Sequence, residues 1–171
     1  MLRRLCLLAV LGLVCGGFVP ARAQDMGDKF EFSAGYAYMH FKSLPTANLN
    51  GFDVSGQYKV RSWLGGVADV SGEYGQVGGV SSQVYTYLFG PQLCWPPRRI
   101  SPFAHALFGA GYFSGGGYTN RAIAAEYGAG VDWKIKTRWS WRVLEANLVE
   151  TRLGGVAEHS ARVSTGIVFH F

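Results

Sequence analysis

The sequence predicts an all-β fold, an eight-stranded antiparallel up-and-down β-barrel that spans a membrane. Apolar and polar residues alternate with a period of two along most of the chain, which is the pattern of strands with one apolar face. The sequence is 49% hydrophobic and 15% aromatic, yet after Val19 it has no apolar run long enough for a transmembrane helix. Its 24 glycines also disfavour long helices, because each costs about 1 kcal/mol relative to alanine inside a helix.

The first 23 residues have the pattern of a cleaved secretory signal peptide. Two arginines precede the apolar stretch Leu5–Val19, and an Ala-x-Ala site ends at Ala23. About 15 apolar residues are too few for a membrane anchor, which needs about 20. Cleavage at Cys15, as in a lipoprotein, is the weaker alternative because Val14 rather than a small residue precedes it. We therefore expect residues 1–23 to be removed and residues 24–171 to form the barrel.

Cleavage changes the charge and the cysteine content of the chain. Three arginines leave with the signal peptide, so the formal charge falls from +5 to +2. This balance gives no electrostatic basis for binding nucleic acid. Cys94 is then the single cysteine, so no intramolecular disulfide can form. The remaining length suits one domain.

Eight segments of the mature chain have the composition expected of strands. They are Phe30–Tyr38, Phe52–Val60, Leu64–Tyr74, Val84–Gln92, Phe103–Tyr112, Ile123–Ile135, Leu144–Leu148 and Arg162–Phe171. In the first segment, Phe30 and Phe32 share one face while Glu31 and Ser33 share the other. The fourth and fifth segments are apolar on both faces, so their orientation stays open, although His105 is easier to place inside.

The other five segments repeat the alternation of the first. In each of them one residue can represent the apolar face and one the polar face. These pairs are Phe52/Asp53 in the second segment, Val70/Asp69 in the third, Tyr127/Glu126 in the sixth, Leu144/Glu145 in the seventh and Ile167/Arg162 in the eighth. An even number of strands of about nine to eleven residues fits a bilayer crossed at a tilt of about 45°. With the N-terminus in the periplasm, periplasmic turns fall near 61–62, 94–101 and 136–138. The outer connections then fall near 42–50, 75–81, 114–117 and 151–158.

The aromatic residues agree with this arrangement. All five tryptophans lie beside the three periplasmic turns: Trp63, Trp95, Trp133, Trp139 and Trp141. Tyrosines and phenylalanines, among them Tyr38 and Tyr112, fall at the other rim. Aromatic girdles at both interfaces are typical of membrane barrels. A soluble β-sandwich or a lipocalin-like barrel is the alternative, and its tryptophans would not need to gather at one end.

The last strand provides the most specific motif. Apolar or aromatic residues alternate up to the terminal aromatic, at Thr165, Ile167, Phe169 and Phe171. This segment resembles the assembly signal of outer-membrane β-barrels, and the mature chain resembles the small outer-membrane β-barrel family that includes OmpA-like and OmpX-like domains. The resemblance implies a place in outer-membrane lipid of a bacterium and insertion by the barrel-assembly machinery. It implies no particular activity, because such folds host many functions.

Charged residues on the inner faces predict an ionic plug. The main members are Glu31, Asp69, Glu126, Asp132, Glu145 and Arg162, and the same faces carry Asp53, Lys59, Glu73, Lys134 and His170. An eight-stranded barrel is just wide enough for side chains to fill it, and buried charges without partners cost several kcal/mol each. We expect Arg162 to pair with Glu145 on the neighbouring strand and with Glu126 or Glu31 across the lumen.

No local motif points to catalysis or to a bound ion. The four histidines are scattered and Cys94 lies in a turn, so no paired metal-ligand spacing occurs. His159-Ser160 is the one adjacent His–Ser pair, but neighbours on a strand point to opposite faces. We therefore expect no metal, no cofactor and no enzymatic activity.

These observations favour a non-enzymatic outer-membrane barrel with a structural or surface-interaction role and a filled interior. Any binding specificity would lie in the four short outer loops, and the sequence identifies neither a surface partner nor an oligomeric state. A narrow porin-like pore for small solutes is the alternative, although aqueous pores need about 16 strands.

Overall fold

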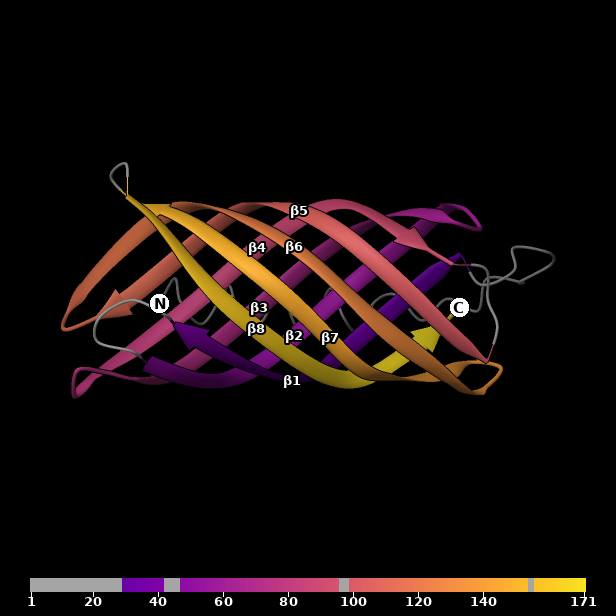
Figure 1. The fold of residues 1–171 in the computed structure, drawn as a ribbon, viewed down its shortest axis with the longest axis horizontal. Helices are drawn as coiled ribbons and strands as arrows, with labels where there is room; N and C mark the ends of the chain where they lie inside the picture. Colours follow the sequence, from indigo (N-terminus) through magenta and orange to yellow (C-terminus); the bar gives the residue numbers. More distant parts are fainter. Residues whose placement is uncertain (1–28, 42–46, 96–98, 154–155) are drawn as a thin grey trace, which may run out of the picture.

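Eight antiparallel strands form one closed barrel in the computed structural model, which describes residues 29–41, 47–95, 99–153 and 156–171 (Figure 1). In chain order the strands are β1 (Phe30–Phe41), β2 (Ala47–Arg61), β3 (Leu64–Val77), β4 (Val80–Cys94), β5 (Ile100–Gly115), β6 (Tyr118–Lys136), β7 (Trp139–Leu153) and β8 (Val156–His170). Each strand pairs with the next, and β8 pairs with β1 to close the sheet. The predicted fold class is confirmed, while the expected signal peptide lies outside the described residues.

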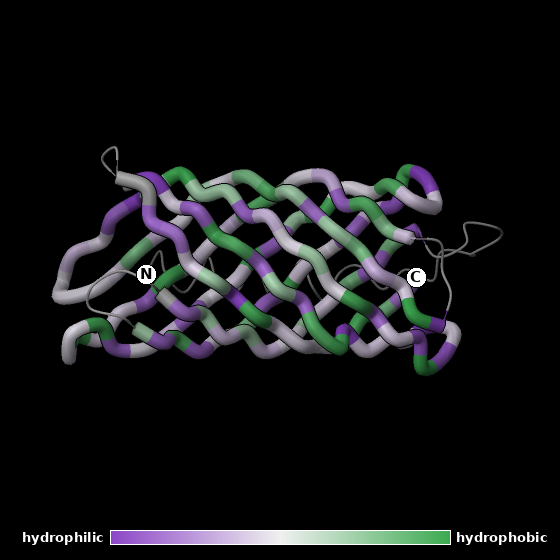
Figure 2. Tube along the Cα trace, in the orientation of Figure 1, coloured by the Kyte–Doolittle hydropathy of each residue, from purple (hydrophilic) through white to green (hydrophobic). Residues whose placement is uncertain are grey.

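The alternation of the sequence sorts side chains between the two faces of the wall. In β1, Phe32 and Tyr36 are exposed on the outside, whereas Glu31 and Ser33 are buried inside. Hydrophobic and hydrophilic residues alternate along the strands in the same way around the barrel (Figure 2). Apolar side chains exposed over the whole outer wall are unfavourable in water and suit hydrocarbon. No helix in the described ranges is long and apolar enough to cross a membrane.

The orientation of β4 and β5, which the sequence left open, follows from their neighbours. Leu88 of β4 pairs with Asp69 of β3, and Leu107 of β5 pairs with Glu126 of β6. Directly paired residues lie on the same face of a sheet. Leu88 and Leu107 are therefore buried inside with the carboxylates, and His105 joins them as expected.

The strands are longer than predicted, at 12 to 19 residues. The connections expected near 75–81 and 151–158 are consequently shorter, because β3 runs to Val77 and β7 to Leu153. Two-residue turns at Gly78-Gly79 and Gly116-Gly117 join the long hairpins, and all four glycines have positive φ between 59° and 85°. A type I′ turn requires positive φ at both central residues, which glycine adopts without strain. Paired strands can continue beyond the lipid because their backbone groups stay hydrogen-bonded to each other.

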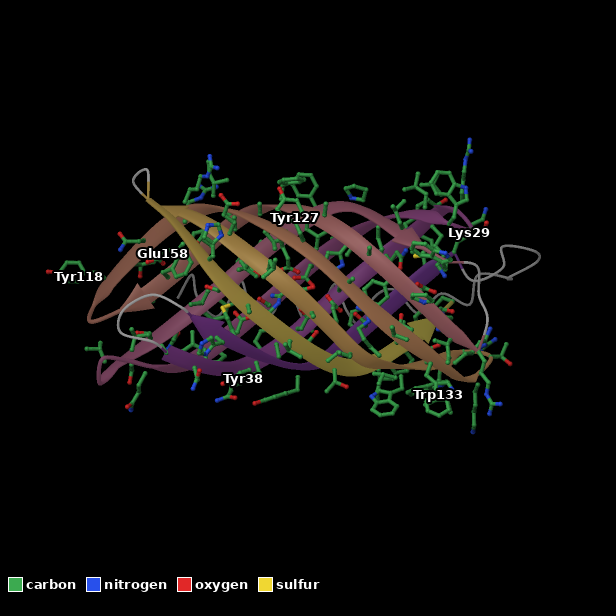
Figure 3. All side chains as sticks on the ribbon, viewed as in Figure 1. Lys29, Tyr38, Tyr118, Tyr127, Trp133 and Glu158 are labelled. Atoms are coloured by element: carbon green, nitrogen blue, oxygen red, sulfur yellow. The ribbon has the colours of Figure 1, made fainter. Side chains whose placement is uncertain are left out.

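The two ends of the barrel differ in composition. The five tryptophans lie at one end, together with the start of β1 and the end of β8, and we call it the tryptophan end. Trp133 and Lys29 mark this end in Figure 3, while Tyr118 and Glu158 mark the opposite end. Two apolar clusters lie inside the barrel. One contains Met39, Ala47, Leu49, Val84 and Val149, and the other contains Val67, Leu88, Leu107 and Ala124.

Candidate functional site

Arg162 of β8 is the centre of a buried ion cluster that crosses the lumen. Its guanidinium lies 2.7 Å from the Glu126 carboxylate, 3.3 Å from those of Asp53 and Asp69, and 3.4 Å from that of Glu73. Arg162 is fully buried. The cluster joins β8 to β6 and to the neighbouring strands β2 and β3, none of which pairs with β8, so side chains meet across the lumen at this level. We call these five residues the Arg162 cluster.

The partners of Arg162 differ in part from those expected. The predicted contact with Glu126 is present, but Glu145 pairs with Arg142 and Glu31 pairs with Lys59. Glu145 was the expected partner because it lies on the strand next to Arg162. Arg162 pairs in register with Asn147, which is two positions from Glu145. The closed barrel instead brings the guanidinium to Asp53, Asp69 and Glu73, contacts that a single pair of strands does not reveal.

A second ion cluster surrounds Arg142 of β7, which the strict alternation of the sequence failed to place inside. Arg142 contacts Asp132 at 2.9 Å and Glu145 at 2.9 Å, and its guanidinium lies 4.3 Å from the centre of the Phe103 ring. Residues three positions apart on a regular strand point to opposite faces. The register of β7 shifts between Arg142 and Glu145, and this β-bulge turns both side chains inward.

Hydrogen bonds link three strands where the barrel closes at the tryptophan end. His170 Nδ1 lies 2.7 Å from Glu31 Oε1, and His170 Nε2 lies 2.7 Å from Ser140 Oγ. Lys59 also pairs with Glu31. These side chains border a cavity of about 250 Å³, which Cys94 also lines. The expected inner positions of Glu31, Lys59 and His170 agree with this arrangement, whereas Ser140 was not anticipated because it lies far from the others in sequence.

His105 of β5 lies beside two carboxylates rather than apart from other ligand-type side chains. Its Nε2 is 3.4 Å from Glu126 Oε1 and 3.9 Å from Glu145 Oε1. All three side chains are buried. No local metal-ligand spacing marks these residues in the sequence, because they come from three strands and are about twenty residues apart in the chain.

The tryptophans form a band on the outer wall. Trp63, Trp95, Trp133, Trp139 and Trp141 are all exposed on the outside. Trp133 pairs in register with Trp141, and the rings of Trp139 and Phe169 have centroids 3.9 Å apart. An indole ring is favoured where hydrocarbon meets water, so a band at one level indicates one membrane interface.

Comparisons with solved structures agree with this architecture. Neisserial surface protein A, NspA, matches with a TM-score of 0.72 and 15% identity over 84% of this chain and 97% of that one. Ail, the attachment invasion locus protein of Yersinia pestis, matches at 0.58 with 17% identity over 85% and 100% of the two chains. The N-terminal β-barrel domain of Pseudomonas aeruginosa OprF matches at 0.55 with 16% identity over 85% and 100%. The chain has the fold of the small eight-stranded outer-membrane β-barrels. No protein-family model and no curated protein sequence matches it.

In this outer-membrane barrel fold, the last strand completes the wall. Ile167, Phe169 and Phe171 lie on its outer face with Thr165, as the alternation predicted. The Phe171 N–H donates to the Phe30 carbonyl at 2.8 Å, so the terminal residue also pairs β8 with β1. Thr165 Oγ1 donates to the Arg142 carbonyl at 2.9 Å, which satisfies a backbone group at the β7 bulge. Recognition of this strand by assembly machinery stays a prediction.

Proposed function

We propose that this chain is a non-enzymatic barrel of the bacterial outer membrane with a structural or surface-interaction role, and that its interior is closed to ions and solutes. The Arg162 cluster is the observation that carries this proposal. One guanidinium contacts four carboxylates from three other strands, so ion pairs extend across the lumen rather than along its wall. A water-filled path of useful width would require these pairs to separate.

Apolar residues strengthen the closure at the same depth and toward the opposite end. Leu88 and Leu107 fill the lumen beside the carboxylates with which they pair, and Met39 pairs in register with Arg162 itself. Met39, Leu49 and Val84 belong to one buried apolar cluster. Dehydrated apolar layers raise the barrier to ion passage further, because an ion would lose its hydration without gaining ligands.

Planar-bilayer recording of the refolded mature chain, residues 24–171, tests the closed interior against the porin-like alternative. We expect no steady single-channel current from the wild-type protein. Insertion is verified in the same preparation by the shifted electrophoretic mobility of the unheated barrel. Large, long-lived currents from monomeric protein would support the pore and contradict the closed interior.

The end of the barrel opposite the tryptophan end supplies the surface that any partner would contact. With both strand termini in the periplasm, the Gly78-Gly79 and Gly116-Gly117 hairpins face outward, and Tyr118 beside the second turn is 79% exposed. Two structural neighbours are named a surface protein, NspA, and an attachment invasion locus protein, Ail, and these names favour a surface role for this barrel. Protease added to intact cells should cut a cleavage site inserted at Gly116-Gly117 and spare one inserted at 137–138. Cleavage at 137–138 but not at Gly116-Gly117 would show that the tryptophan end faces outward.

The Ser140–His170–Glu31 chain resembles the order of a serine hydrolase relay, so it calls for a separate test. Acyl transfer also needs donors for an oxyanion. The nearby backbone N–H groups of Lys134 and His170 are already bonded, at 3.0 Å each, to the carbonyls of Arg99 and Arg138. We infer that these hydrogen bonds instead hold β7, β8 and β1 together where the barrel closes. Labelling of Ser140 by a fluorophosphonate probe, lost in Ser140→Ala, would contradict the non-enzymatic proposal.

A further inference from the structure

Three ligand-type side chains converge inside the barrel between β5, β6 and β7. His105, Glu126 and Glu145 place one ligand atom each within 4.8 Å of one another. The His105 and Glu145 side chains are 3% exposed and Glu126 is fully buried. Imidazole and carboxylate ligands in this number are the donor set of divalent transition metals, above all Zn²⁺.

Besides Glu126 Oε2, two polar atoms at this point lack hydrogen-bond partners among the described residues. They are His105 Nε2 and Asn147 Oδ1, both on side chains that are more than nine-tenths buried. A buried polar atom without a partner costs about 1–3 kcal/mol, so native proteins rarely leave one unpaired. An imidazole nitrogen and an amide oxygen that lie together beside Gly128, next to buried carboxylates, are good ligands for a cation.

The absence of a side chain at Gly128 makes room for these two atoms. A β-carbon at this position would collide with Asn147 Oδ1 and His105 Nε2 before it met any backbone atom. Gly128 lies on β6 and pairs in register with both His105 and Asn147. The missing side chain therefore leaves a small cradle whose walls are the two unpaired atoms.

The charges around the cradle also favour a cation. Six buried carboxylates belong to the two ion clusters, and two guanidinium groups, Arg142 and Arg162, face them. The carboxylates are those of Asp53, Asp69, Glu73, Glu126, Asp132 and Glu145. Buried charge is tolerated where it is paired, protonated or bound to a metal. The two arginines leave a formal excess of negative charge that a divalent ion would reduce.

We propose that the barrel binds one Zn²⁺-class divalent cation through His105 Nε2, the carboxylates of Glu126 and Glu145, and Asn147 Oδ1. The ligand carboxylates are already oriented by neighbours. Arg142 Nη1 donates to Glu145 Oε2 at 2.9 Å, Asn147 Nδ2 donates to Glu145 Oε1 at 2.9 Å, and Arg162 lies 2.7 Å from the Glu126 carboxylate. Such outer contacts hold ligands in place and raise metal affinity.

Phe103 separates this site from the cavity at the tryptophan end. Its ring lines that cavity and stacks on the His105 ring, with centroids 6.1 Å apart. The metal enters during barrel formation or when Phe103 moves, and it then ties β5, β6 and β7 together. This proposal is independent of the proposed surface role, because a metal could be held whether or not the barrel conducts.

The test uses the mature chain refolded in detergent with Zn²⁺ or with Co²⁺, followed by dialysis against buffer without metal. We expect one retained metal per folded barrel and, with Co²⁺, the strong visible absorption of low-coordinate cobalt. His105→Gln and Gly128→Ala should each weaken binding at least ~10-fold, the second without removing a ligand atom. His40→Gln is the matched control, since His40 bonds Asn48 near the opposite end.

Each result bears on the proposal. Retention below one metal per two wild-type barrels overturns it, and so does equal retention by wild type, His105→Gln and Gly128→Ala. If His105→Gln fails to fold, Gly128→Ala and the cobalt spectrum of the wild type still decide. A weak spectrum typical of six-coordinate cobalt that is the same in the wild type and His105→Gln would place the metal elsewhere and reject the buried site.

Discussion

Arg142 and Glu145 lie three positions apart on β7, yet both point into the barrel, with Arg142 Nη1 2.9 Å from Glu145 Oε2. The β-bulge between them makes this contact possible, and Thr165 of β8 stabilises it by donating to the Arg142 carbonyl. An irregularity of one residue therefore adds a second buried arginine to an interior in which acidic groups predominate.

Replacing Arg142 by leucine should strongly destabilise the barrel, because Asp132 and Glu145 would remain buried without their partner. The expected loss is about 3–5 kcal/mol of unfolding free energy. Arg152→Leu is the control, since that arginine is largely exposed beside Glu150 and such pairs contribute about 0–1 kcal/mol. Equilibrium urea unfolding in lipid vesicles, followed by tryptophan fluorescence, measures both. Similar losses for the two variants would show that the Arg142 pairs are not buried from water.

An arginine on the lipid-facing wall should cost more at mid-membrane than near an interface. Ala129 is exposed on β6, between Tyr127 near the middle of the barrel and Trp133 at the tryptophan end (Figure 3). Ala129→Arg should cost about 2–4 kcal/mol, and Ile135→Arg, beyond Trp133 on the same face, about 0–1 kcal/mol. Unfolding titrations in vesicles compare the two. Equal costs would mean that this face does not contact lipid.

The positive φ of Gly117 should make this hairpin turn sensitive to an alanine side chain. Gly117 has φ of 85°, and a β-carbon there would meet no atom within 4 Å. Gly117→Ala should therefore cost about 1–2 kcal/mol through backbone strain alone. Gly56→Ala also has open space and lacks the positive φ, so it should be neutral or slightly stabilising. The difference in urea midpoint between the variants isolates the conformational effect, and identical midpoints would contradict it.

Deleting Phe171 should reduce assembly in cells more than refolding in detergent. The deletion removes an exposed aromatic ring and the 2.8 Å hydrogen bond from the Phe171 N–H to the Phe30 carbonyl. We expect less heat-modifiable protein in the outer-membrane fraction and more degraded protein in the periplasm. Phe171→Trp keeps an aromatic ring and the backbone pair, and should assemble normally. Wild-type amounts of the deletion variant in the outer membrane would refute the role of this residue as an assembly signal.

The sequence alone determined which residues face lipid and which face the interior on six of the eight strands, with Arg142 of β7 as an exception. This information is local, because successive side chains on a strand point to opposite faces and one face must be apolar. The aromatic band and the inward position of Glu126, Glu145 and Arg162 followed from the same rule. The even strand number and the approximate places of the connections followed from the spacing of the apolar segments, although the strands extend beyond those segments.

Only the tertiary structure decided which interior groups meet. The register of eight strands brings Asp53, Asp69 and Glu73 to Arg162, although no pattern in the chain links them. The bulge that turns Arg142 inward breaks the alternation on which sequence reasoning depends. His105 reaches Glu126 and Glu145 because closing the sheet fixes three strands at once. Contacts across a lumen depend on long-range pairing, whereas the face of each residue depends on its immediate neighbours.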